Sequence, residues 1–196
     1  MLVVHLQLIS QDIFNFIQPI IISILAINLF HIFSKKISLK RQRIKRILRT
    51  LVFSIVFGVL FFALGEPIPE LFSMNFGVIL LFTFFVSFGE EILFRGIIYS
   101  FAVRSFSKKT ALHLQALVFS IIHFTGLMYL FNHFSSNGSM VLVGIINMIL
   151  YFLALYWFSI VAAKLTTFDK KRINLTRPIL LHWLVNCLSL VLYLSL

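Results

Sequence analysis

The stretch FGVILLFTFFVSFGEEILFRGIIYSFAV, Phe76–Val103, decides the fold class of this chain. It is longer than the about 20 apolar residues that cross a bilayer core of about 30 Å as a helix. Yet Glu90, Glu91 and Arg95 stand near its middle. Insertion scales give each such charge a cost of about 2.5–3.5 kcal/mol at a helix centre, and charges placed there usually face the bundle interior and mark function. The stretch therefore predicts a transmembrane helix that carries part of a site.

The rest of the chain has the same apolar character. Of its 196 residues 60% are hydrophobic and 24 are Phe, and the mean hydropathy is +1.03. A water-soluble fold has too little interior to cover this much apolar surface. Six apolar segments are candidate spans: 12–33, 47–65, 76–103, 110–131, 140–163 and 177–195. We predict an all-α, polytopic transmembrane helix bundle of about six spans.

This bundle is expected to form one integral membrane domain over residues 1–196, with its motif-bearing core at about 76–196. No repeat at a solenoid period and no low-complexity tail divides the chain. No Lys or Arg precedes the first apolar run, and no small-residue cleavage site follows it, so the first helix is expected to be retained. The single cysteine, Cys187, excludes a disulfide framework and a CxxC metal site.

The basic residues alternate between the predicted connections. All of them except Arg95 fall in the first, third and fifth connections, around 35–49, 104–109 and 164–177. Six spans, an even number, place these three connections on one side of the membrane, which by the positive-inside rule is the cytoplasmic side. Both termini are therefore predicted to lie outside. The net charge of +11 is explained by topology and by attraction to anionic lipid headgroups, and nucleic-acid binding is not expected.

Helix geometry separates the two glutamates of the third span. Glu91 and Arg95 are four residues apart and share one face of a helix. Glu90 is about 140° around the helix from Arg95. We therefore expect Glu91 and Arg95 to form an ion pair, which alone would serve as a structural staple. Glu90 has no local partner and must find one on another helix.

Two further spans offer polar side chains in helical register. In the fourth span Phe119 and His123 are four residues apart, and in the sixth span His182 and Asn186 are too. Polar residues inside membranes also hold helices together, at about 0.6–2 kcal/mol each. A functional site is the stronger interpretation, because Glu90, His123 and the His182–Asn186 pair come from three different spans and none has an obvious local partner.

The motifs EEILFR at 90–95, FSIIH at 119–123 and HWLVN at 182–186 match the patterns EExxxR, FxxxH and HxxxN, in that order. They resemble the CPBP family, also called the CAAX protease or Abi family, of intramembrane endopeptidases. The eukaryotic member removes the last three residues of prenylated CAAX proteins. Many bacterial members are linked to bacteriocin production, self-immunity or peptide-signal maturation. The resemblance covers about half of the chain, and the first two spans carry no motif.

The resemblance implies a role for each motif residue. Glu90 and His123 would hold and activate a water molecule. His182 and Asn186 would polarise the scissile carbonyl and form an oxyanion hole. The remaining motif residues would support the site structurally: Glu91, Arg95 and Phe119.

A metal site is the rival mechanism. Glu90, His123 and His182 would make a His₂Glu set with an open position, which suits catalytic zinc. We favour a metal-free mechanism without a cofactor, because no HExxH motif is present and the three ligands would come from three helices. The partners expected are membrane lipid and a peptide or protein substrate, and the expected location is a cell membrane, with a bacterial plasma membrane as the working assumption.

Two other functions remain open. One is a non-catalytic membrane protein, such as an immunity factor that shields a target by binding it. The other is a small transporter or ion pathway, because intramembrane Glu and His relay protons in such proteins; the absence of recognisable inverted repeats disfavours it. As nucleophiles, Ser87 and Ser120 lack a GxSxG setting, and Cys187 has no local base.

Overall fold

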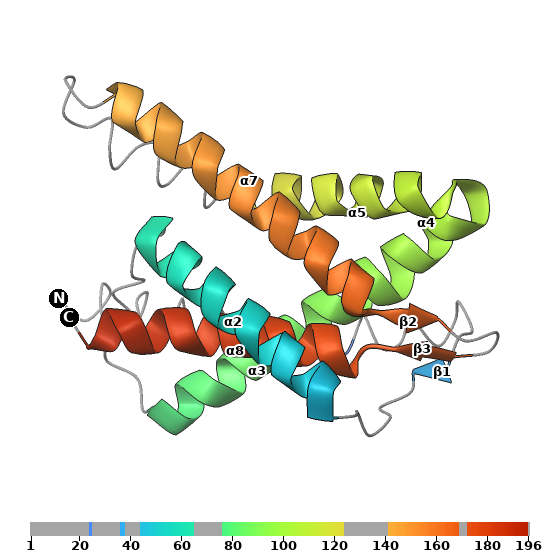
Figure 1. The fold of residues 1–196 in the computed structure, drawn as a ribbon, viewed down its shortest axis with the longest axis horizontal. Helices are drawn as coiled ribbons and strands as arrows, with labels where there is room; N and C mark the ends of the chain where they lie inside the picture. Colours follow the sequence, from blue (N-terminus) through green and yellow to red (C-terminus); the bar gives the residue numbers. More distant parts are fainter. Residues whose placement is uncertain are drawn as a thin grey trace, which may run out of the picture.

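The computed structural model describes residues 24, 36–37, 44–64, 76–123, 141–168 and 172–195, and this part of the chain is almost entirely helical (Figure 1). One long helical stretch runs through α3 and α4 without a break, because a π-helix joins them. The helices are α2 (Ile44–Leu64), α3 (Phe76–Glu91), the π-helix η2 (Ile92–Tyr99), α4 (Ser100–Ser105), α5 (Lys108–Ile122), α7 (Val141–Leu165) and α8 (Thr176–Leu194).

Four of these helical stretches are long and apolar enough to cross a membrane: Arg46–Leu64, Phe76–Ser105, Val141–Leu165 and Thr176–Leu194. They coincide with the second, third, fifth and sixth predicted spans to within a few residues. Their outer faces carry large apolar side chains, among them Leu142 and Trp157, which are more than half exposed. Such faces suit contact with lipid. The predicted all-α membrane bundle is thus confirmed.

The other two predicted spans lie wholly or partly beyond this part of the chain. Only Ile24 of the span at 12–33 is described, and it is helical. The described part of the span at 110–131 is α5, whose 15 residues are fewer than the about 20 that cross a bilayer. The number six and the outside location of the termini therefore stay predictions.

Helices α2 and α8 pack together and run in the same direction. The Ser54 hydroxyl donates to the carbonyl of Leu181 at 3.5 Å, and four residues further along α2 the carbonyl of Gly58 accepts from the Ser189 hydroxyl at 3.1 Å. The approach is close at Gly58, where an added Cβ would come within 2.7 Å of the Leu188 side chain. Small residues at such positions let membrane helices approach one another.

A small sheet, which the all-α prediction does not include, lies beside the end of α7 and the start of α8 (Figure 1). Its strand order is β1-β3-β2, with β1 parallel and β2 antiparallel to β3. The strands are β1 (Lys36–Ile37), β2 (Thr167–Phe168) and β3 (Arg172–Asn174). Because β1 belongs to the first predicted connection and β2 and β3 to the fifth, the sheet places these two basic connections together, as the charge alternation predicts.

The core is an aromatic cluster where α2, η2, α5, α7 and α8 meet. Phe158 of α7 is almost fully buried and packs edge-on against Phe57 of α2, with ring centroids 5.4 Å apart. Phe94 of η2 and Phe119 of α5 pack edge-on at 4.8 Å. These rings fill the space directly beside the polar motif residues and so exclude other side chains from it.

Candidate active site

The two glutamates lie where α3 changes into the π-helix η2. A π-helix has i→i+5 hydrogen bonds and usually occurs as a single turn, often at functional sites. Here it extends over eight residues, Ile92–Tyr99. Sequence reasoning missed this element, because a π-helix leaves no distinct hydrophobic period.

Glu91 is completely buried and joins η2 to α8. Its Oε1 lies 2.9 Å from Nη1 of Arg95 and also 2.9 Å from Nδ1 of His182. The ion pair that the helix spacing predicts is therefore present. A carboxylate oxygen can only accept a hydrogen bond, so Nδ1 of His182 carries a hydrogen and donates to Glu91. This fixes the orientation of the imidazole and leaves Nε2 facing the other glutamate.

Glu90 lies between two histidines from other elements. Its Oε2 is 3.5 Å from Nε2 of His123, at the end of α5, and 3.8 Å from Nε2 of His182 on α8. Nδ1 of His123 lies 2.7 Å from the carbonyl oxygen of Phe119, so it donates there and its Nε2 is left for Glu90. The Glu90 side chain is 24% exposed, whereas that of Glu91 is 0% exposed. Three predicted site residues are thus brought together, with one carboxylate accessible.

Asn186 is held one turn further along α8 from His182. Its Nδ2 donates to the Ser87 hydroxyl at 3.1 Å, and that hydroxyl donates in turn to the carbonyl of Thr83 at 2.7 Å. The Ser87 hydroxyl donates its hydrogen to Thr83, so it can only accept from Asn186. This identifies the Asn186 group that faces Ser87 as the NH₂ and not the carbonyl oxygen. No direct contact between Asn186 and Glu90 is recorded. Ser87, rejected as a nucleophile, therefore has a place in the site as an orienting group.

Two buried polar residues that sequence reasoning missed, Gln115 and Ser159, hold the far side of Arg95. Nη2 of Arg95 donates to the Ser159 hydroxyl at 3.1 Å. Gln115 donates to the Ser159 carbonyl at 3.2 Å and accepts from its hydroxyl at 3.3 Å. The sequence does hold one signal for this cluster: Gln115 stands inside an apolar helix, one turn before Phe119.

Phe119 packs against His123 on one side of the site and against Arg95 on the other. Its ring centroid is 4.4 Å from that of His123, and the guanidinium carbon of Arg95 lies 4.8 Å from it. A cation over an aromatic face is attracted by the ring quadrupole. The ring thus separates the accessible histidine from the buried arginine.

The chemical types of Glu90, His123 and His182 suit zinc, and at zinc sites the second ring nitrogen of a ligating histidine commonly donates to a carboxylate, as Nδ1 of His182 does to Glu91. Within the described ranges, however, no three His, Cys, Asp or Glu side chains are arranged to hold a metal ion. Zinc dependence therefore stays a question for experiment.

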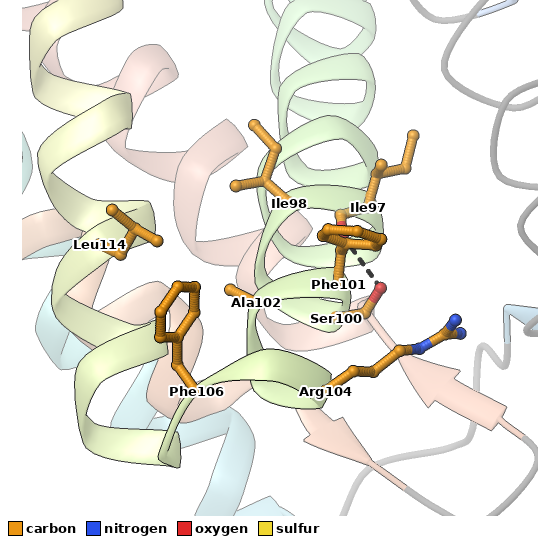
Figure 2. Close-up of a pocket in the computed structure, with 8 residues that line it drawn as sticks. All are labelled: Ile97, Ile98, Ser100, Phe101, Ala102, Arg104, Phe106 and Leu114. Atoms are coloured by element: carbon orange, nitrogen blue, oxygen red, sulfur yellow. Dashed lines mark hydrogen bonds between the residues drawn. The ribbon is translucent and has the colours of Figure 1, made fainter.

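A pocket of about 450 Å³ lies elsewhere, at the junction of η2, α4 and α5 (Figure 2). No motif residue lines it. Its one charged side chain, Arg104, extends away from Phe106 and Leu114 (Figure 2). The Ser100 hydroxyl donates a hydrogen bond to the Ile97 carbonyl at 3.1 Å. The pocket is almost wholly apolar and offers no group for acid–base chemistry.

The fold and the site together define a multi-pass membrane protein with a Glu–His cluster inside its helix bundle. A family model described as "Type II CAAX prenyl endopeptidase Rce1-like" matches residues 72–188, more than half of the chain and all three motifs. The chain belongs to this family, whose members are CAAX proteases and hence hydrolases. This confirms the resemblance that the motifs carry. No curated protein and no solved structure gives a significant match.

Proposed function

We propose that the protein is an intramembrane endopeptidase that hydrolyses a peptide bond by means of a water molecule activated by Glu90 and His123. The observation that carries the proposal is the position of Glu90 Oε2, which faces Nε2 of two histidines from different helices. Family membership makes peptide hydrolysis the expected chemistry.

The accessible carboxylate is the proposed general base. The 3.5 Å between Glu90 and His123 exceeds a good hydrogen bond, so both groups remain able to bind a water molecule beside them. Glu90 takes a proton from that water while the water oxygen bonds to the carbonyl carbon of the scissile peptide. The same proton then passes to the leaving nitrogen, so that a carboxyl group and an amine are released. Such acid–base steps contribute about 10²–10⁴-fold.

Helix α8 supplies the proposed oxyanion site. Asn186 uses one of its two amide hydrogens on Ser87 and keeps the other for the carbonyl oxygen. His182, held by Glu91 at Nδ1, donates from Nε2 when that nitrogen is protonated. Fixed donors in a water-poor cavity stabilise the tetrahedral oxyanion strongly, because they need no reorganisation during the reaction.

The substrate proposed is a peptide or a membrane-proximal protein segment, since Glu90, His182 and Asn186 lie in helices that are long and apolar enough to cross a membrane. A role in bacteriocin maturation or self-immunity in a bacterial plasma membrane is part of the proposal. It is supported only by the resemblance to bacterial members of the CPBP family.

The test compares purified wild type with Glu90→Gln and His123→Ala in detergent, on quenched peptides that include a prenylated CAAX peptide. Cys187→Ser is the matched control, because Cys187 lies beside Asn186 on α8 but contacts Thr83 and not the carboxylates. We expect cleavage by wild type and control, and a loss of about 10²–10⁴-fold in the two variants. Each assay is repeated with a chelator.

A folded Glu90→Gln protein with full activity would overturn the proposal. Activity that chelator removes and zinc restores would replace water activation by Glu90 with the zinc mechanism. No cleavage by any protein, together with equal protection of cells by wild type and Glu90→Gln, would favour the non-catalytic binding protein instead.

A further inference from the structure

A second charged cluster, outside the candidate active site, lies at the start of α8. Arg177 is only 8% exposed, and its Nε has no hydrogen-bond partner. The hydroxyl oxygen of Thr176 beside it is also buried without a partner. Burying an arginine without a counter-charge is costly, and so is burying a hydroxyl without a hydrogen bond. Two adjacent groups of this kind are suited to bind a polar ligand.

The parallel packing of α2 and α8 brings more positive charge to the same place. Ser54 meets Leu181, so one turn back along both helices Arg177 lies at the level of Thr50. Arg46 and Arg49, in the turn around Thr50, lie close enough to act electrostatically on Arg177. Three arginines therefore lie near one another at the first turns of two helices.

The described residues provide no anion for this cluster. Their two carboxylates, Glu90 and Glu91, are committed to the site described above. Asp169, outside the described residues, belongs to the same predicted side but stands next to Lys170 and Lys171. Like charges that repel one another at a membrane surface favour an external anion.

The backbone of α8 leaves this role to side chains. The N–H of Thr176 is bonded to the Asn174 side chain at 3.0 Å, that of Ile179 to the carbonyl of Leu175, and Pro178 has none. An anion here is therefore bound mainly by guanidinium groups and by the Thr176 hydroxyl. This set of donors matches the oxygens of a phosphate, which arginine binds in a planar, two-pronged geometry.

We propose that Arg177, Arg46 and Arg49, with the Thr176 hydroxyl, bind the phosphate group of an anionic phospholipid. The cluster lies at the ends of two helices that cross the membrane, where headgroups are found. Beside it on α2, Ile44 and Leu48 are exposed by more than half and offer an apolar ridge for an acyl chain. Free phosphate lacks that chain, and a peptide carboxylate would need fewer than three cations. The site is independent of the proposed peptidase activity.

The test measures lipid binding by purified protein in a neutral detergent. Phosphatidylglycerol is titrated and counted by native mass spectrometry, with phosphatidylcholine as the zwitterionic comparison. Variants are Arg177→Gln, Arg46→Gln and Arg49→Gln, and the matched control is Arg104→Gln, another exposed basic side chain on the same predicted side. Each cluster variant is expected to weaken phosphatidylglycerol binding about fivefold, and the control to leave it unchanged.

Arg46 and Arg49 are exposed, so their variants keep the test decisive even where Arg177→Gln fails to fold. Equal weakening by Arg104→Gln would overturn the proposal in favour of diffuse charge attraction. Equal binding of phosphatidylcholine would overturn it as well. Inorganic phosphate competing as well as the lipid would reassign the site to a soluble phosphate. If a peptide with a free carboxyl terminus displaces the lipid and the same peptide with a C-terminal amide does not, the site would be reassigned to the carboxylate of a peptide substrate.

Discussion

Glu90 and Glu91 are neighbours in the chain, but the two regions around them are built in opposite ways. Glu91 is sealed, with Arg95 and His182 both at 2.9 Å from one oxygen. Glu90 is partly exposed, and its two histidine partners stay at 3.5 Å and 3.8 Å. The difference shows how a helix bundle can hold a rigid half and an accessible half within one helical turn.

The largest expected effect comes from breaking the sealed half. Arg95→Leu leaves Glu91 as a buried charge without its cation, which typically costs about 3–5 kcal/mol. We expect little protein to accumulate in membranes and a lower resistance to denaturant, whereas Glu90→Gln should accumulate like wild type. Quantitative immunoblots and unfolding in mixed detergent measure both.

A double variant sharpens this result. Glu91→Gln with Arg95→Leu removes the charge and its partner together, while the glutamine oxygen still accepts from His182. It should recover part of the lost stability. An Arg95→Leu protein that accumulates and unfolds like wild type would contradict the sealed-half interpretation.

The next largest effect, on kcat, is expected at Asn186 of α8. Asn186→Leu removes a proposed oxyanion donor and should lower kcat by about 10²–10³-fold, with little change in KM. Steady-state kinetics on the best peptide measure this split. A variant that raises KM alone would show that Asn186 binds substrate in the ground state instead.

A smaller effect is expected from the group that orients Asn186. Ser87→Ala leaves the amide free to rotate, and should lower kcat by about fivefold, as expected for the loss of one hydrogen bond of about 1 kcal/mol. Its control is Ser120→Ala, because Ser120 is equally buried but donates only to a carbonyl of its own helix, that of Ala116. Equal losses in the two variants would mean that Ser87 acts through stability alone.

An effect of similar size, on stability instead of activity, is expected at Ser159, which lies behind Arg95. Ser159→Ala removes one partner of a buried guanidinium and should cost about 1–2 kcal/mol in the free energy of unfolding. Ser54→Ala is the comparison, because this buried hydroxyl bonds only to carbonyls, those of Thr50 and Leu181. Unfolding of the two variants under one set of conditions measures the difference. Equal costs would show that Arg95 does not depend on Ser159.

The sequence predicts the parts of this molecule that rest on helical spacing and on charge. The spacing of four positions from Glu91 to Arg95 is enough to predict their ion pair, and helical periodicity places Phe119 beside His123. The alternation of basic connections predicts that the first and the fifth lie on one side of the membrane, and the sheet that joins β1 to β3 agrees with this. Long apolar runs give the bounds of the four described spans almost directly.

The parts that escaped prediction depend on packing between helices. Nothing in the sequence indicates which helix faces Ser87, Gln115 or Ser159, so their partners became visible only in three dimensions. The π-helix at 92–99 needs the surrounding core to favour it over an ordinary helix. Strands of two or three residues carry no pattern of their own, and β1 depends on a partner 136 positions later, at Lys36↔Arg172.

The parallel pairing of β1–α2 with β3–α8 has a consequence for biosynthesis. Helix α2 leaves the ribosome long before α8, so it must wait in the membrane without its main packing partner. Contacts between such distant segments form late and slow folding. The same delay applies to chemistry, because Glu90 and His123 meet His182 only when α8 has inserted. A growing chain therefore carries no complete Glu–His cluster, and the membrane around the translocon is not exposed to the assembled site.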